Sequence, residues 1–236
     1  MQEFFFVLVP KYLPFLLEGA LVTVELSVIS MSIAIVLGLL VAVGRLSGIR
    51  ALDWLLQVYV EVWRNVPLIV QLLLIYFTLP EVGLTLPAFW AGVLGLSLNL
   101  GAYLSEVFRA AIGSVDKGQR DAAISIGMSR VTAFRRIVLP QAFLIALPTL
   151  GGYFISLLKD CALVSFIAVN ELLRNGTIII SSTFRSMEIY LMVAMIYFAM
   201  SFVSSRLVRW LELRLTPAYL RPRGIAWRQA EKTVAA

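Results

Sequence analysis

The sequence has no histidine and a single cysteine, Cys161, among its 236 residues. This composition excludes a Ser-His-Asp triad, an internal disulfide and a His/Cys metal site. Charged residues are also scarce, at 14%, whereas 60% of the residues are hydrophobic and the mean hydropathy is +0.90. Because so few polar side chains cannot cover a globule in water, the composition argues against a soluble enzyme.

The apolar residues lie in long blocks, and blocks of about 18 residues or more can span a bilayer. The sequence therefore predicts an all-α polytopic membrane protein with about five transmembrane helices. Their approximate ranges are 19–44, 54–79, 88–109, 140–158 and 187–207. Glu61, Arg64 and Pro67 interrupt the second range, so its first turns are predicted to be interfacial or packed inside the bundle.

The distribution of Lys and Arg predicts the orientation, because cytoplasmic loops retain these residues during insertion. Placing the amino terminus outside puts most of the 20 basic residues in two inner loops and the carboxyl-terminal tail. This gives an external amphipathic segment (1–18), which does not resemble a cleaved signal peptide, a transmembrane domain (19–215) and a cytoplasmic tail (216–236). A solvated cytoplasmic rim accounts for the net charge of +6, so no nucleic acid is expected to bind.

The segment 114–139 is the longest polar stretch, and its composition is that of a folded loop. A short helix is expected over Gln119–Ile126, ended by Gly127, where a left-handed residue costs little. Ser129 is expected to cap a second short helix over Arg130–Ile137, before Pro140 opens the next span. Two short helices held between two spans would form a rigid docking element on the cytoplasmic side.

This loop is similar to the "EAA" loop of permease subunits of bacterial ATP-binding-cassette (ABC) importers. The matching residues are Ala122, Ala123, Gly127, Ile137, Leu139 and Pro140, with Asp121 where that family usually has Glu. The resemblance extends over about Leu13 to Leu213 to the polar amino acid uptake branch. It includes Arg64, Pro67-Leu68, Gln71-Leu72, Tyr103, Glu106, Arg109, Asp116 to Gln119 and Lys159-Asp160. Cys161-Ala162 departs from it, because Thr-Ser is common there.

The resemblance implies a type I importer permease (MetI-like) fold and a set of partners. These are a dimer of ABC ATPase subunits, a second permease that is an identical chain or a paralogue, an external solute-binding protein, a polar amino acid and membrane lipid. The docking residues implied for the ATPase are Gly118, Gln119, Asp121, Ala122, Ala123, Gly127 and Met128. No G-x-x-x-x-G-K-[ST] run is present, so no cofactor is assigned to this chain, and ATP and Mg would be bound by the partner ATPase.

Charged and amide side chains within the spans are candidates for the solute path, because such residues need a partner or a water-filled cavity. Glu61 and Arg64 are three residues apart and are expected to pair, either as packing or as a gate or solute contact. Gln71 and Asn99 are the leading solute contacts, with hydrogen bonding between helices as the alternative.

Two further pairs lie near the ends of spans. Lys159 and Asp160 are adjacent, so both cannot point inward from one regular helix, and one of them is expected at the outer mouth of the path. Glu106 and Arg109 are expected to form a salt bridge within the third span.

Two other classes of protein remain as alternatives. A secondary carrier or channel for amino acids would work without an ATPase, although such proteins tend to have internal inverted repeats. A receptor or assembly factor would bring no polar residues together at mid-membrane. The sequence does not identify the amino acid that is carried.

Overall fold

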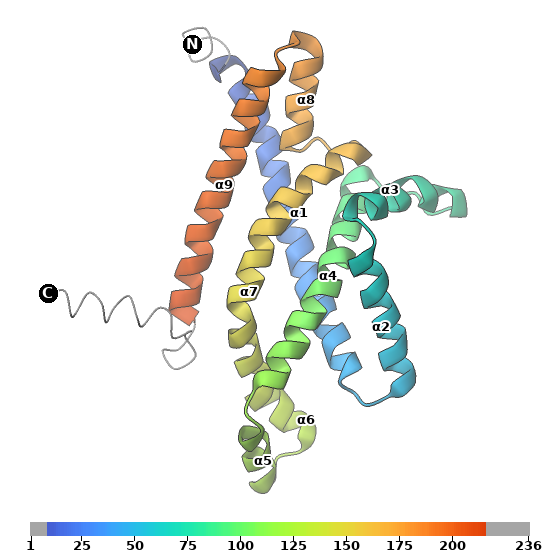
Figure 1. The fold of residues 1–236 in the computed structure, drawn as a ribbon, viewed down its shortest axis with the longest axis vertical. Helices are drawn as coiled ribbons and strands as arrows, with labels where there is room; N and C mark the ends of the chain where they lie inside the picture. Colours follow the sequence, from blue (N-terminus) through green and yellow to red (C-terminus); the bar gives the residue numbers. More distant parts are fainter. Residues whose placement is uncertain (1–8, 216–236) are drawn as a thin grey trace, which may run out of the picture.

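The computed structural model describes residues 9–215, and every regular element in that range is helical (Figure 1). The helices are α1 (Val9–Arg45), α2 (Arg50–Asn65), α3 (Leu68–Thr78), η2 (Leu79–Val82), α4 (Ala88–Ser114), α5 (Lys117–Ser125), α6 (Arg130–Ala133), η3 (Phe134–Val138), α7 (Leu139–Asp160), η4 (Cys161–Ile167), α8 (Leu172–Thr183) and α9 (Ser186–Leu215). Within the described range, 4 helical stretches are long and apolar enough to cross a membrane, and the bent pair α2–α3 makes 5 if it is one span. The expected all-α architecture with about five spans is confirmed.

The centre of the bundle is the close packing of α1 against α4. Gly38 of α1 lies against Gly101 and Leu104 of α4, where an added Cβ would come within 3.0 Å of the Gly101 carbonyl oxygen. On the other side of the bundle, α7 meets α9 at Gly151, where an added Cβ would collide with a methyl of Val208. Small residues at such crossings let helix backbones approach closely in a membrane, where no hydrophobic force drives helices together.

The helices extend beyond the ranges expected from the sequence. Helix α1 begins at Val9, so residues 9–18, which we expected to form an external amphipathic segment, continue the first helix. Leu16 is fully buried there and packs with Leu172 and Ile189 of the carboxyl-terminal helices. Residues 1–8 and the expected tail, 216–236, lie outside the described residues.

The second expected span, 54–79, is not one helix. Helices α2 and α3 meet at an angle of 106°, and α3 projects sideways from the bundle (Figure 1). The break falls at Val66 and Pro67: Val66 is extended, with ψ of 133°, and Pro67 precedes the first turn of α3. Proline has no N–H to continue the helix and disfavours helical geometry in the residue before it.

Helix α8 was not expected from the sequence and lies along α1 and α9 (Figure 1). Its amino terminus is capped by Glu171, a fully buried carboxylate. One Glu171 oxygen accepts the Arg174 N–H at 2.7 Å, and the other accepts the Leu173 N–H at 2.9 Å and the Tyr197 hydroxyl at 2.8 Å. This carboxylate therefore ties α8 to α9.

We expect Glu171→Ala to lower the free energy of unfolding by about 2–3 kcal/mol, because three partly buried donors lose their acceptor. The measurement is denaturant-induced unfolding of the purified protein in detergent. Glu18→Ala, at an exposed glutamate of α1, is the matched control and should leave the midpoint unchanged. Equal midpoints for both variants would contradict this role for Glu171.

Candidate solute path and docking loop

Two amide side chains form hydrogen bonds to backbone carbonyls at the break between α2 and α3. The Gln71 amide nitrogen donates to the carbonyls of Trp63 and Val66, both at 2.9 Å. The Asn99 amide nitrogen, on α4, donates to the Trp63 carbonyl at 2.9 Å and to the Gln71 side-chain oxygen at 3.0 Å. These carbonyls lie at a helix end and lack helical partners, so the two amides satisfy them and join α2, α3 and α4.

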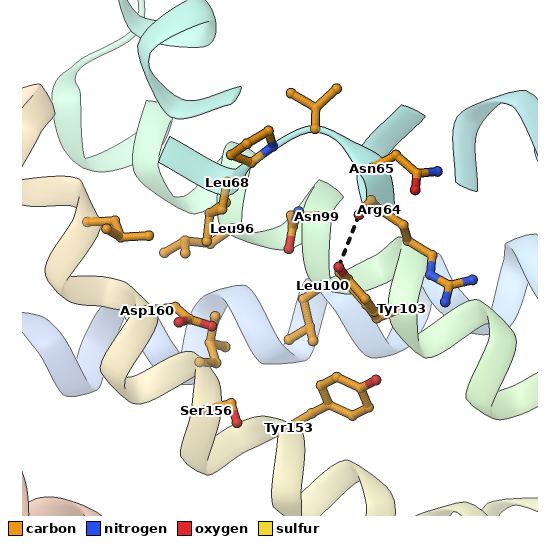
Figure 2. Close-up of a pocket in the computed structure, with 14 residues that line it drawn as sticks. Arg64, Asn65, Leu68, Leu96, Asn99, Leu100, Tyr103, Tyr153, Ser156 and Asp160 are labelled. Carbon is orange, nitrogen blue, oxygen red and sulfur yellow. Dashed lines mark hydrogen bonds between the residues drawn. The ribbon is translucent and has the colours of Figure 1, made fainter. Parts of the chain in front are cut away.

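Arg64 does not pair with Glu61, which corrects the sequence interpretation. Within the described residues, the acidic side chains in ion pairs are Asp53 and Glu106. The Glu61 carboxylate instead accepts a hydrogen bond from Asn65 at 3.0 Å. The Arg64 guanidinium lies 5.3 Å from the centre of the Tyr103 ring, a cation–π contact. Arg64 lines a cavity at the end of α2, with its guanidinium on the far side of the Tyr103 ring from Asp160 (Figure 2).

This central cavity, of about 400 Å³, lies at the helix break (Figure 2). Its volume is in the range typical of small-molecule sites, about 300–1,000 Å³. It is lined by Arg64, Asn65, Val66, Pro67, Leu68, Leu96, Asn99, Leu100, Tyr103, Tyr153, Ser156, Leu157, Asp160 and Leu163. Figure 2 shows Arg64 on one side and Asp160 on the other, with the tyrosine rings between them. The cavity therefore carries one cation and one carboxylate on opposite walls.

The predicted path residues separate into two groups. Arg64, Asn99 and Asp160 line the central cavity, whereas Gln71 and Lys159 do not. Gln71 is only 5% exposed and is engaged at the helix break, so the structure gives it a role in packing. Of the adjacent pair Lys159 and Asp160, Asp160 lines the central cavity and Lys159 does not, and the position of either at the outer mouth of a path stays a prediction.

A second cavity, of about 480 Å³, lies further along α4 and α7 towards the α5–α6 end of the bundle. It is lined by Arg64, Tyr103, Glu106, Val107, Ala110, Ala111, Ser114, Ile145, Ala146, Thr149 and Tyr153. We call it the loop-side cavity. Five of these eleven side chains are aliphatic or alanine, and Ser114 and Thr149 add hydroxyl groups.

The carboxylate of the loop-side cavity, Glu106, is already neutralised. It pairs with Arg109 at 2.5 Å, as the sequence predicted, and also with Arg45 at the end of α1. Arg45 in turn contacts Asp53 of α2 at 3.2 Å. This network ties α1, α2 and α4 together at one end of the bundle.

The loop between α4 and α7 folds into two short helices, as the sequence predicted. Asp116 accepts the Gly118 N–H at 2.7 Å, so α5 begins at Lys117, two residues earlier than expected. Gly127 has a φ of 88° and ends α5, with the Met128 N–H bonded to the Ala123 carbonyl at 3.1 Å. This is the Schellman arrangement, which favours glycine at the left-handed position.

The second short helix is more continuous with the next span than expected. Ser129 caps α6 by accepting the Thr132 N–H at 3.2 Å, as predicted. Helix α6 then passes through the π turn η3 into α7, so Pro140 lies in a continuous helical stretch, Arg130–Ile167. Force on the loop would therefore act directly on α7.

The predicted docking residues do not all face outward. Gly118, Gln119, Asp121, Ala122 and Gly127 are exposed, and Met128 is half-buried. Ala123 is only 4% exposed, because α5 packs on η3 and α6. Ala123 therefore faces its own chain, and the loop instead exposes three apolar side chains, those of Ile124, Ile126 and Val131.

The sequence interpretation missed two tyrosines of the cavities and two acidic residues that join helices. Tyr103 was noted only as part of the resemblance, and Tyr153 not at all, although both line the two cavities. Sequence periodicity does not indicate the roles of Glu171 and Asp53, because their partners, Tyr197 and Arg45, lie on other helices. The signal that could have predicted α8 is a lone acidic residue, Glu171, directly before an amphipathic stretch.

Comparison with known proteins identifies the class. The family model described as "Binding-protein-dependent transport system inner membrane component" matches residues 34–217. The L-cystine transport system permease protein TcyB of Bacillus subtilis (strain 168) is 40% identical over 206 residues, covering 87% of this chain and 88% of TcyB. The glutamine transport system permease protein GlnP of Escherichia coli (strain K12) is 38% identical over 205 residues, covering 86% and 94%.

A solved structure agrees with these relatives. In a crystal structure of an amino acid ABC transporter with histidines, one chain is 41% identical, with a TM-score of 0.82 and coverage of 89% of this chain and 98% of that chain. The protein belongs to the family of inner-membrane components of binding-protein-dependent transport systems. It is a multi-pass permease subunit of an amino acid ABC importer.

Gln71→Leu should lower the free energy of unfolding by about 1–3 kcal/mol, because the Val66 carbonyl loses its donor inside the bundle. Gln57→Leu, which removes an exposed amide of α2, should have no effect. Thermal unfolding of the two purified variants measures the difference. A Gln71→Leu protein as stable as the Gln57→Leu protein would show that the break does not need this amide.

Proposed function

We propose that this permease subunit forms the path by which an ABC importer moves a polar amino acid across the bacterial inner membrane. The observation that carries the proposal is the central cavity, which has Arg64 and Asp160 on opposite walls (Figure 2). The names of TcyB and GlnP, which refer to L-cystine and glutamine, support the same class of solute.

The two charges fit the common part of every free α-amino acid. A guanidinium can donate two parallel hydrogen bonds to the solute carboxylate, and a carboxylate can accept from the solute ammonium. Within the described residues no ion pair joins either Arg64 or Asp160 to a side chain of opposite charge. Both are therefore available to a zwitterion, and the Ser156 hydroxyl and the side-chain oxygens of Asn65 and Asn99 add hydrogen-bonding groups around it.

The energy for transport would come from partner subunits. A dimer of ABC ATPases would bind ATP and Mg, and an external solute-binding protein would deliver the amino acid. A second permease, identical or paralogous, would cover the side of the bundle where Arg64 is exposed. An exposed charge within a membrane needs such a partner or water.

The α5–α6 loop is the proposed docking site for the ATPase. Its exposed apolar side chains are presented on two short helices that connect α4 to α7. The Lys and Arg distribution supports a cytoplasmic position for this loop, with the amino terminus outside and the carboxyl terminus in the cytoplasm.

Asp160→Asn should raise the solute concentration needed for half-maximal uptake by about tenfold or more, since one charge-assisted hydrogen bond contributes about 1.5–3 kcal/mol. Lys159→Gln, at the neighbouring position outside the cavity, should change it by less than about twofold. Uptake of labelled amino acids into proteoliposomes containing the whole complex measures both. Similar losses in the two variants would contradict the assignment of Asp160. Uptake that persists without the ATPase would favour the secondary carrier.

Ala122→Asp should reduce co-purification of the ATPase, because it places an unpaired charge in the proposed contact. Gly127→Val should do the same, because a β-branched residue at φ of 88° costs roughly 1 kcal/mol or more. Gly113→Asp adds the same charge at an exposed site at the end of α4, outside the loop, and should keep the ATPase bound. If all three variants retain the ATPase, the loop is not its docking site.

A further inference from the structure

The two cavities meet at a row of three side chains, one from each of three helices. Arg64 of α2, Tyr103 of α4 and Tyr153 of α7 line both cavities, and they are the residues that the two linings share. The rings of Tyr103 and Tyr153 are 6.1 Å apart, and the Arg64 guanidinium lies over the Tyr103 ring. The Tyr103 hydroxyl also donates to the Arg64 carbonyl at 3.2 Å (Figure 2).

The two chambers on either side of this row differ in chemistry. Arg64 lines both cavities, but the central cavity also has a carboxylate, Asp160, that is in no ion pair within the described residues. The carboxylate of the loop-side cavity, Glu106, is held by two arginines. A solute ammonium would therefore find an unpaired carboxylate in the first chamber and not in the second.

We propose that Tyr103 and Tyr153, with Arg64, form a partition that separates a solute-holding chamber from a release chamber. This inference rests on the proposed transport function, because it assigns the step that controls passage along the same path. Aromatic rings suit the role, since paired rings fill space and have few rotamers, while Arg64 can exchange its contact with Tyr103 for a solute carboxylate. Because Tyr103 and Tyr153 lie on the two helices that the α5–α6 loop connects, movement of the loop would change their separation.

The chain offers a direct test by cysteine accessibility. Cys161 is its single cysteine, so the Cys161→Ser subunit has no thiol. Thr149 and Ser156 are exposed positions on α7, about one turn to either side of Tyr153, in the loop-side and central cavities respectively. Thr149→Cys and Ser156→Cys are each made in this subunit, which is then assembled into the complete complex, and labelling is measured on this subunit alone.

A charged methanethiosulfonate is added from the ATPase side without nucleotide. We expect Thr149→Cys to react about tenfold faster than Ser156→Cys, because opening the partition separates one aromatic pair, whose contact accounts for a factor of up to about ten. Adding Tyr153→Ala or Tyr103→Ala should bring Ser156→Cys to within about threefold of Thr149→Cys. Tyr153→Phe keeps the ring and should keep the difference. Tyr190→Ala, at an exposed tyrosine of α9, is the matched control and should also keep it.

Two outcomes would overturn the partition: equal reactivity of the two thiols with both tyrosines intact, or no acceleration of Ser156→Cys in either alanine variant that still assembles by size-exclusion chromatography. These rates do not depend on which solute is carried. Amino-acid-stimulated ATP hydrolysis by the unmodified complex is measured in parallel. If the amino acid does not stimulate ATP hydrolysis but the labelling rates differ as expected, the proposed transport of an amino acid is rejected. If the amino acid does stimulate hydrolysis but the labelling rates do not differ, only the partition is rejected.

Discussion

The hydrogen bonds that Gln71 and Asn99 make to the end of α2 are the interaction on which the rest of the site depends. A helix broken inside a bundle leaves carbonyl groups without donors, and in a membrane each unsatisfied group is costly. The two amides supply those donors and join three helices. With the break held in this way, α2 ends beside the central cavity, which Arg64 lines, while α3 departs at 106°.

Charge is distributed unequally along the path. Arg64 and Asp160 have no partner of opposite charge within residues 9–215, whereas Glu106, Arg109, Arg45 and Asp53 satisfy one another at the loop end. The proposed solute contacts are therefore unpaired, and the second group stabilises the bundle. Under the proposed function, this difference would favour the solute ammonium in the central cavity over the loop-side cavity. The α5–α6 loop connects the two helices, α4 and α7, that carry the tyrosine rings between these chambers.

Much of this architecture is predictable from the sequence because long apolar blocks and turn residues are local signals. The span count, the Gly127 turn, the Ser129 cap and the Glu106–Arg109 pair each depend on residues close together in the chain. The failures concern contacts between distant segments. Spacing along α2 predicted a Glu61–Arg64 pair, but Asn65 and Tyr103 compete for these side chains. Likewise, Ala123 is buried by packing within the loop, and the capping of α8 depends on Tyr197, which lies 26 residues after Glu171.

The central claim is that the cavity at the helix break holds an amino acid between Arg64 and Asp160. The most direct measurement is an experimental structure of the complete transporter with a transported amino acid bound. The account predicts the solute carboxylate within hydrogen-bonding distance, about 2.7–3.2 Å, of the Arg64 guanidinium. The solute ammonium should lie on the Asp160 side of the cavity. A solute bound elsewhere in the membrane domain, or in this cavity with its carboxylate towards Asp160, would contradict the account.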